Sequence, residues 1–226
     1  MLPLRFLWQQ LNDEIVACRR CNRLVEWREQ VARERRRAFF DWNYWGKPVP
    51  GFGDRQARVL VVGLAPGAHG SNRTGRMFTG DSSGDFLYRA LYEAGFANQP
   101  QASHAGDGLE LREIFITAVC RCAPPNNRPT PQEILNCQPF LMKEMQLLER
   151  LEGIVALGKV AFDRVQKILK PQSPLLSFSH AAFYRLGEGL PWLLASYHPS
   201  RQNTQTGKLT REMFAQVWEK VKMELD

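Results

Sequence analysis

The chain has 226 residues, of which 44% are hydrophobic and 23% charged. This composition is typical of one globular α/β domain and excludes a disordered chain. No run is long enough to span a bilayer and the N-terminus lacks a signal-peptide pattern, so we expect a cytoplasmic protein with no membrane partner. The net charge is +7, with 22 arginines against 8 lysines. Arginine suits bidentate phosphate contacts, so a polyanionic partner such as nucleic acid is compatible with this charge, and a basic surface that serves solubility is the alternative.

The N-terminal region is predicted to be helical and then strongly charged. Leu2 to Val16 carries apolar residues at i, i+3 and i+4 spacing, which indicates an amphipathic helix. Eight arginines follow between Arg19 and Arg37, interleaved with three glutamates. Two interpretations remain open for this run: a solvated helix with alternating charges, or a surface that faces phosphates. Residues 42–51 are aromatic and turn-rich and are predicted to form a packed loop.

A glycine-rich loop follows the first predicted strand. Val59 to Val62 are four apolar residues, typical of a strand buried on both faces. The next stretch, up to Asp81, contains five glycines among polar side chains and Phe78. Glycines let backbone N–H groups approach a ligand, and ligands of open α/β sheets bind beyond the carboxyl ends of the strands. The loop is either an ordinary connection or, as we favour, a site for a planar or phosphorylated group.

The rest of the chain alternates between helices and strands. This alternation predicts a mostly parallel, doubly wound sheet. Asp81 and Ser82 are both candidate N-caps of the first of these helices. The predicted helices are Ser83–Gly95, Pro131–Leu151, Lys159–Leu169 and Leu209–Glu224, and the predicted strands are Ile114–Val119, Gly153–Gly158 and Leu193–Tyr197.

Five cysteines are spaced like the ligands of a metal centre. Cys18 and Cys21 form a CxxC pair after a helix, and Cys120, Cys122 and Cys137 follow far downstream. A redox CxxC would open a helix after a strand, so four metal-binding thiolates fit better. The wide spacing of the downstream cysteines favours an iron–sulfur cluster over zinc. Buried free thiols are the alternative, and spacing does not choose between Cys120 and Cys122.

Three loops are predicted to meet at the carboxyl edge of the sheet. They are residues 63–81, 123–129 and 198–207. The third loop opens with His198, and a neutral histidine at a strand end can donate to a developing anion without carrying charge itself. A structural role for this histidine remains the alternative.

Three segments together resemble the iron–sulfur uracil-DNA glycosylases, and within them the family 5 (type b) enzymes of thermophiles. The segments are G-L-A-P-G-A-H-G-S-N-R-T-G-R-M-F-T-G-D, C-R-C-A-P-P-N-N-R-P with Cys137 beyond it, and S-Y-H-P-S-R-Q-N-T. The resemblance implies an α/β fold, a three-layer α/β/α sandwich around a mostly parallel four-stranded sheet. It implies one glycosylase domain over residues 1–226, with the N-terminal segment (about 1–45) tied in by a structural [4Fe-4S] cluster. The implied reaction is hydrolysis of the N-glycosidic bond of uracil in DNA by a monomer, leaving an abasic site for base-excision repair.

The resemblance also implies roles for individual residues. Phe78 matches the aromatic residue that stacks on the flipped base, and His198 the histidine that contacts its carbonyl. Cys122 takes the third ligand position because related type a enzymes have a single cysteine before the P-P-x-N-R run. Residues 199–206 resemble the wedge that enters the duplex. The implied cluster ligands are Cys18, Cys21, Cys122 and Cys137; the implied base pocket is Gly63, Ala65, Phe78, Ala118 and His198; the implied DNA contacts are Arg73, Arg76, Arg128, Ser200, Arg201 and Asn203.

Two positions depart from the relatives that act strictly on uracil. Leu64 stands where those enzymes have glutamate, which leaves the water-activating group unassigned. Asp81 is the nearest loop carboxylate, and it is a catalytic candidate as well as a candidate helix cap. Ala118 stands where they have an asparagine that reads the uracil edge, so we expect wider substrate acceptance, including hypoxanthine.

Two other functions are weighed against this one. A non-catalytic, metal-stapled nucleic-acid-binding module would need neither Asp81 and His198 nor the aromatic Phe78 beside them. A hydrolase of free nucleotides is disfavoured because the chain has no G-x-x-x-x-G-K-[ST] motif.

Overall fold

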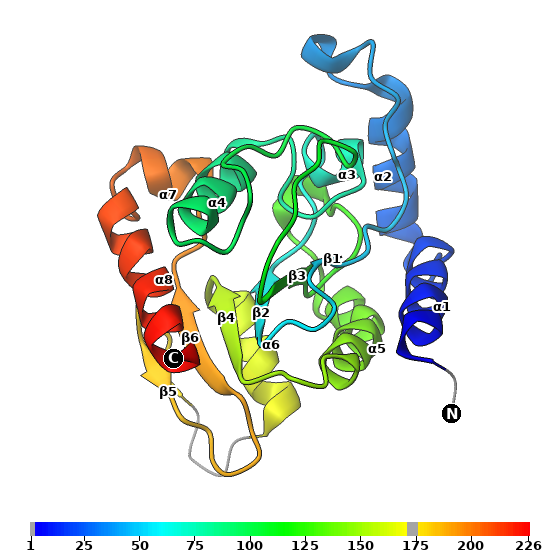
Figure 1. The fold of residues 1–226 in the computed structure, drawn as a ribbon. Helices are drawn as coiled ribbons and strands as arrows, with labels where there is room; N and C mark the ends of the chain where they lie inside the picture. The colour runs from blue at the N-terminus through cyan, green and yellow to red at the C-terminus, as the bar shows by residue number, and fades with distance from the viewer. Residues whose placement is uncertain (1–2, 171–175) are drawn as a thin grey trace.

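A computed structural model describes residues 3–170 and 176–226 as one six-stranded sheet covered by helices (Figure 1). The strand order is β1-β3-β2-β4-β6-β5. The four central strands run parallel, and the two edge strands pair antiparallel to their neighbours. The strands are β1 (Phe52–Gly53), β2 (Val59–Gly63), β3 (Ile114–Ala118), β4 (Gly153–Leu157), β5 (Phe183–Tyr184) and β6 (Trp192–Ser196).

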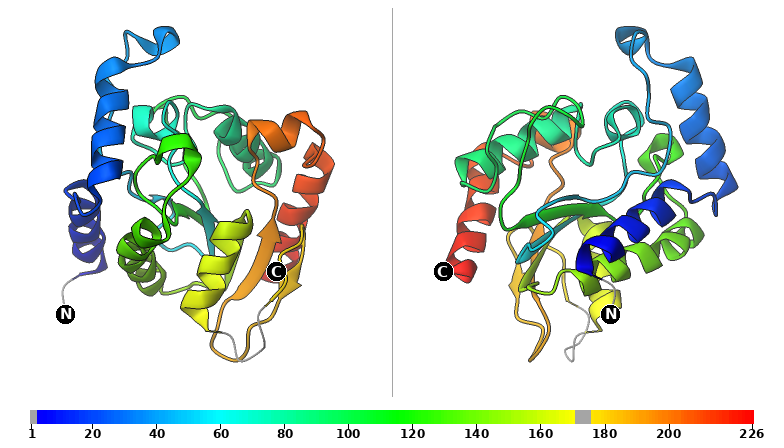
Figure 2. Two further views of the ribbon diagram at one scale, coloured as in Figure 1. Left: turned by 180° about the vertical axis from the view of Figure 1, so that it is seen from behind. Right: turned by 45° about the vertical axis from the view of Figure 1, so that its right-hand side comes forward.

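Helices cover both faces of this sheet. Alternate strand residues point to opposite faces, and all five residues of each central strand are buried. Val61 therefore packs toward α4 and α8, whereas Leu60 packs toward α1, α5 and α6. Figure 2 shows the resulting three layers from two further directions. The helices are α1 (Leu4–Val16), α2 (Asn22–Glu34), α4 (Ser82–Glu93), α5 (Pro131–Leu147), α6 (Lys159–Leu169) and α8 (Arg211–Leu225), with shorter helices η1 (Arg37–Phe39), α3 (Ser71–Thr74), η2 (Pro125–Asn127) and α7 (Arg201–Gln205).

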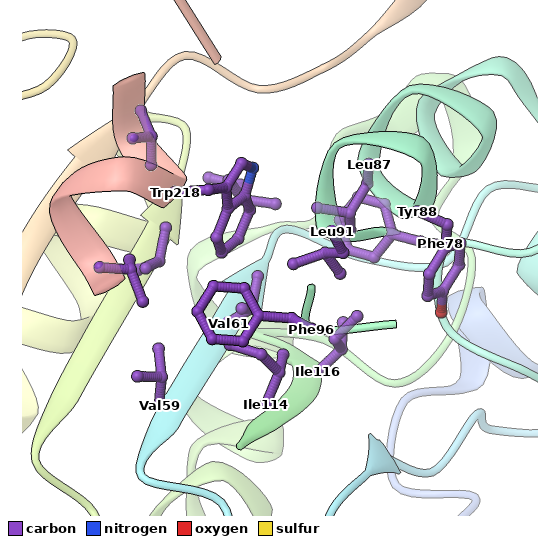
Figure 3. Close-up of a cluster of buried hydrophobic side chains, with 14 of the residues drawn as sticks. Val59, Val61, Phe78, Leu87, Tyr88, Leu91, Phe96, Ile114, Ile116 and Trp218 are labelled. Carbon is purple, nitrogen blue, oxygen red and sulfur yellow. The ribbon is translucent and has the colours of Figure 1, made fainter. Parts of the chain in front are cut away.

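The layer between the sheet and α4 and α8 is rich in aromatic side chains. Trp218 packs edge-to-face against both Phe96 and Phe214. Figure 3 shows part of this cluster, in which strand residues such as Val61 and helix residues such as Leu87 surround the aromatic rings. Phe78 belongs to the same cluster, so the glycine-rich loop that contains Phe78 is anchored in this part of the hydrophobic core.

The predicted α/β fold and its parallel central strands are confirmed, with three corrections. The sheet has six strands and not four, because β1 and β5 are two residues long and too short to show a period. Helix α5 ends at Leu147 and not Leu151. The loops predicted as irregular contain α3 and α7. Leu2, where the first helix was predicted to begin, lies outside the described residues.

Within the described ranges, none of the helices combines the length and apolar character needed to cross a bilayer.

Candidate active site and cysteine centre

Phe78 lies across the carboxyl end of β2 because the residue beneath it is glycine. A Cβ built on Gly63 would lie 2.7 Å from Cζ of the Phe78 ring, which is closer than real side chains approach. A Cβ on Gly84 would lie 1.7 Å from the Phe78 carbonyl oxygen. Phe78 itself has a positive φ of 51°, a conformation that costs energy for a bulky residue. Two glycines and a strained backbone therefore fix this ring, with 9% of its surface exposed.

His198, which follows β6, stacks on Phe78. The two ring centroids are 5.7 Å apart and the planes differ by 28°. The histidine backbone is held by Asn203, whose Nδ2 donates to the His198 carbonyl at 2.8 Å. Ser200 caps α7 by accepting from the Asn203 N–H. Two segments 120 residues apart in sequence thus present neighbouring rings at the carboxyl edge, as the loop prediction required.

The environment of His198 favours the neutral imidazole. Burial lowers its pKa to about 4, because removing a cation from water is costly. No group among the described residues hydrogen-bonds to its ring nitrogens, and the protein holds only its carbonyl. The ring can therefore donate a hydrogen bond to a ligand at neutral pH without being charged.

Asp81 is the N-cap of α4. Its Oδ1 accepts from the backbone N–H groups of Ser83 and Gly84 at 3.0 and 3.1 Å. Its Oδ2 points into the glycine-rich loop, where a Cβ on Gly70 would lie only 2.0 Å away. Burial raises the pKa of this carboxyl, opposed by the two backbone hydrogen bonds. One oxygen therefore caps the helix and the other faces the loop, so the capping and catalytic roles predicted for Asp81 are compatible.

Two predicted DNA contacts, Arg73 and Arg76, are turned inward. Arg73 is 4% exposed and donates to the carbonyls of His69 and Gly80 at 2.7 and 2.8 Å. Arg76 is 3% exposed and makes two hydrogen bonds to Asp107 at 2.7 Å. Neither guanidinium is free for a phosphate, so this prediction does not fit the structure. Both residues instead hold the shape of the glycine-rich loop.

The other predicted site residues lie at the same edge. Ala118 ends β3 in register with Gly63 and belongs to the buried cluster that contains Phe78. Ala65 is half-buried just beyond β2. Arg128 and Arg201 are exposed, and Ser200 is half-buried. Apolar side chains such as Ala118 therefore line the base of the site at this edge, and the exposed cations Arg128 and Arg201 lie on the surrounding loops.

Four of the five cysteines surround a small hollow between α2, α5 and the segment after β3. Its lining includes the predicted set Cys18, Cys21, Cys122 and Cys137. Cys120 lies outside the lining and is completely buried. Across residues 3–170 and 176–226, no three His, Cys, Asp or Glu side chains converge tightly enough to hold one metal ion.

Buried cations stand beside these thiols. Arg28 is 2% exposed, and its Nη1 donates to Cys122 Sγ at 2.9 Å. Arg28 Nε, and Nε and Nη1 of Arg121, are buried without a hydrogen-bond partner in the described part of the chain. Unpaired buried donors are costly, and they fit a centre that carries negative charge. Sequence reasoning missed Arg28, since nothing in a charged helical run marks one arginine as buried.

The thiols respond to this environment in different ways. Burial raises the pKa of Cys122 to about 12, opposed by Arg28. The pKa of Cys120 is raised and that of Cys137 is lowered to about 6, because the two thiols interact and Cys137 lies near Arg121. A thiol such as Cys122 needs a bound metal cation to ionise at neutral pH.

The fold and this edge are those of a base-excising glycosylase, and comparisons with known proteins agree. The sequence profile of the Uracil DNA glycosylase superfamily matches residues 50–222, and the chain belongs to this superfamily. It is 53% identical over 203 residues to the type-5 uracil-DNA glycosylase of Thermus thermophilus, covering 90% of this chain and 91% of the relative. It is 50% identical over 215 residues to the type-5 enzyme of Mycobacterium tuberculosis, covering 94% and 80%. A type-4 uracil-DNA glycosylase of Pyrobaculum aerophilum is 31% identical over 160 residues, covering 70% and 74%.

Proposed function

We propose that this protein is a monofunctional uracil-DNA glycosylase of base-excision repair, which hydrolyses the N-glycosidic bond of uracil and leaves an abasic site. The observation that carries the proposal is the stacked pair of Phe78 and His198, together with Asp81 of the same loop, whose Oδ2 faces Gly67 and Gly70. The similarity to two type-5 uracil-DNA glycosylases supports the same reaction. A non-catalytic binding module would need no such convergence of an aromatic ring, a neutral donor and a carboxylate.

Each of the three residues has a role in the reaction. The target base must leave the duplex stack before its glycosidic bond can be reached, and Phe78 offers a face on which the flipped base stacks. As the C–N bond breaks, negative charge grows on the base, and the neutral imidazole of His198 donates to the base carbonyl. Asp81 Oδ2 stabilises the cationic sugar and orients the water that attacks it. The sequence offers no carboxylate at Leu64, so stabilisation of the leaving base dominates.

The pocket is proposed to accept more than uracil. Ala118 lies at the base-facing end of β3 and provides no amide to read one base edge. A buried hydrogen-bonding group in a pocket rejects any base that cannot pair with it. A pocket without such a group does not discriminate between bases in this way. Hypoxanthine is therefore the second substrate that we propose.

A [4Fe-4S] cluster held by Cys18, Cys21, Cys122 and Cys137 fits the cysteine centre. Supporting observations are the shared hollow, the exclusion of Cys120 from it, and the buried unpaired donors of Arg28 and Arg121. A zinc site would bring four sulfurs to within about 2.3 Å of a single point, whereas each cluster thiolate binds a different iron. When bound, the cluster supplies structural cross-linking and takes no part in glycosidic hydrolysis.

The cluster would join the N-terminal segment to the rest of a single domain of residues 1–226. Cys18 and Cys21 lie between α1 and α2, Cys122 follows β3, and Cys137 lies in α5. Helix α1 is also buried against α5 through Trp8, Leu11 and Ile15. The proposed working unit is a monomer bound to uracil-containing DNA.

The test is single-turnover cleavage of a labelled duplex with one uracil, beside the same duplex with hypoxanthine. Strand breaks that appear only after alkali on both substrates would support a monofunctional glycosylase with a broad pocket. Cleavage of uracil alone would keep the enzyme and remove the argument from Ala118. Tight binding without any cleavage would instead indicate the binding module.

A second experiment separates the two roles of Asp81. Asp81→Asn keeps an oxygen that can cap α4 but removes the charge. A variant that folds normally and excises uracil at the wild-type single-turnover rate would leave Asp81 with the capping role alone.

A further inference from the structure

The eight arginines between Arg19 and Arg37 divide into two groups of four. Each arginine of the first group contacts another part of the protein. Arg19 pairs with Glu29 and Arg23 with Glu133. Arg28 donates to Cys122, and Arg20 donates to the Asn136 carbonyl and lies over the Phe140 ring. The second group, Arg33, Arg35, Arg36 and Arg37, forms no ion pair with the described residues.

The second group lies on a projecting segment, residues 33–43, which we call the arm. It comprises the end of α2, the short helix η1 and the turn that follows. Figures 1 and 2 show the arm rising beyond the body of the molecule, on the side where α3 and the carboxyl-edge loops lie. Arg36 and Arg37 are exposed, and Phe40 exposes 66% of its surface. Four arginines on the arm outnumber its two acidic residues, Glu34 and Asp41.

The arm is fixed to the glycine-rich loop. The Arg73 guanidinium lies 3.9 Å from the centre of the Phe39 ring and 4.1 Å from that of the Trp42 ring. The same guanidinium donates to the carbonyls of His69 and Gly80. The Tyr44 hydroxyl is 3.1 Å from Nδ1 of His69. The loop that ends in Asp81 therefore also sets the position of the arm.

We propose that the arm is a second DNA contact, which binds the sugar-phosphate backbone of the duplex beside the flipped base. The proposal rests on the function proposed above. Arg36 and Arg37 bind phosphates, because unpaired exposed guanidiniums gain affinity by releasing the counterions condensed on DNA. Phe40, an exposed aromatic side chain over which Arg35 lies, is covered when the duplex is bound. Arg73 is a positioning residue that holds the arm at a fixed distance from the base pocket.

The experiment compares two variants of equal net charge. The double variant Arg36→Gln, Arg37→Gln removes two charges from the arm. The matched control, Lys167→Gln, Lys222→Gln, removes two exposed charges from the end of α6 and from α8, which are remote from the carboxyl edge. For each protein we would measure the dissociation constant for a uracil-free duplex over a range of salt concentrations, and the single-turnover excision rate at saturating enzyme.

The arm variant is expected to bind about tenfold more weakly at low salt. The slope of log K against log salt should fall by about 0.9 for each lost phosphate contact. Its excision rate at saturation should stay at the wild-type value, because neither residue touches the pocket. The control should keep the wild-type slope.

Either of two results would overturn the proposal: a wild-type slope for the arm variant, or equal losses in the arm variant and the control, which would reduce the effect to net charge. Failure of the proposed function would look different. In that case wild-type protein would leave uracil in place, while the binding slopes would still report on the arm.

Discussion

The base pocket and the cysteine centre treat charge in opposite ways. In the pocket, burial lowers the pKa of His198 to about 4 and raises that of Asp81. In the cysteine centre, Arg28 and Arg121 are buried with unpaired nitrogens beside thiols. The pocket presents a neutral donor and a partly shielded carboxyl to its ligand, whereas the cysteine centre places guanidinium nitrogens next to thiols.

This difference agrees with the roles proposed for the two sites. A leaving base gains negative charge only as its bond breaks, so a neutral donor aimed at it stabilises the transition state more than the ground state. A thiolate-bound cluster is anionic at all times, so permanent cations beside it are favourable. If both proposals hold, the fold separates transient from permanent negative charge, and the following predictions test that separation.

The largest effect is expected from the donor in the pocket. His198→Ala removes the donor that we propose for the departing base. We expect single-turnover excision of uracil to fall by about 10²–10³-fold, the usual cost of one such donor, while the thermal midpoint changes little. His198→Gln, which keeps a neutral donor, should recover part of the rate. If both variants kept the wild-type rate, the pocket would not act through this residue.

The next effect concerns the cysteine centre and is a loss of stability. Cys122→Ser removes a proposed cluster ligand, and we expect the thermal midpoint to fall by about 10 °C, or about 3–5 kcal/mol for a chain of this size. Iron content and visible absorbance should fall in parallel. Cys120→Ser is the matched control, because this buried residue lies outside the hollow, and it should keep its iron. Iron loss in Cys120→Ser but not in Cys122→Ser would reverse the assignment.

Acid should destabilise the protein through its partly buried histidines. The folded pKa of His198 is about 4 against 6.5 for the free group, and burial also lowers those of His69 and His180. Below pH 6.5 the unfolded chain binds protons that the folded chain does not, so stability is full above 6.5 and falls as the pH approaches 4. His198 contributes a slope of up to about 1.4 kcal/mol per pH unit, and the more exposed His69 and His180 act in the same direction. Thermal melts of His198→Gln between pH 7 and 4 should show a shallower decline than wild type.

The smallest effect is on substrate choice. Ala118→Asn places an amide at the end of β3, and we expect the ratio of uracil to hypoxanthine excision to rise about tenfold (about 1.4 kcal/mol). Ala118→Leu controls for lost space, because it fills a similar volume without a hydrogen-bonding group. Equal shifts in both variants would mean that size, and not base reading, sets the selectivity.

The sequence by itself determined the central sheet and the location of the site. The apolar, mostly β-branched run Val59–Val62 forms a buried strand, because a strand covered on both faces removes all four side chains from water. Glycines before Asp81, together with a histidine after the last strand, marked the loops that meet at the carboxyl edge. These features are local in sequence, so pattern and chemistry suffice to predict them.

The tertiary structure alone decided which of several similar residues does what. The sequence predicted phosphate contacts for Arg73 and Arg76. In the structure Arg73 packs against the Phe39 and Trp42 rings, and Arg76 forms an ion pair with Asp107. Arg28 looked like part of a solvated helix and instead donates to a thiol 94 residues away. Spacing alone left Cys120 and Cys122 equal, and packing placed only Cys122 at the hollow. Such roles depend on partners distant in the chain, which local periodicity does not encode.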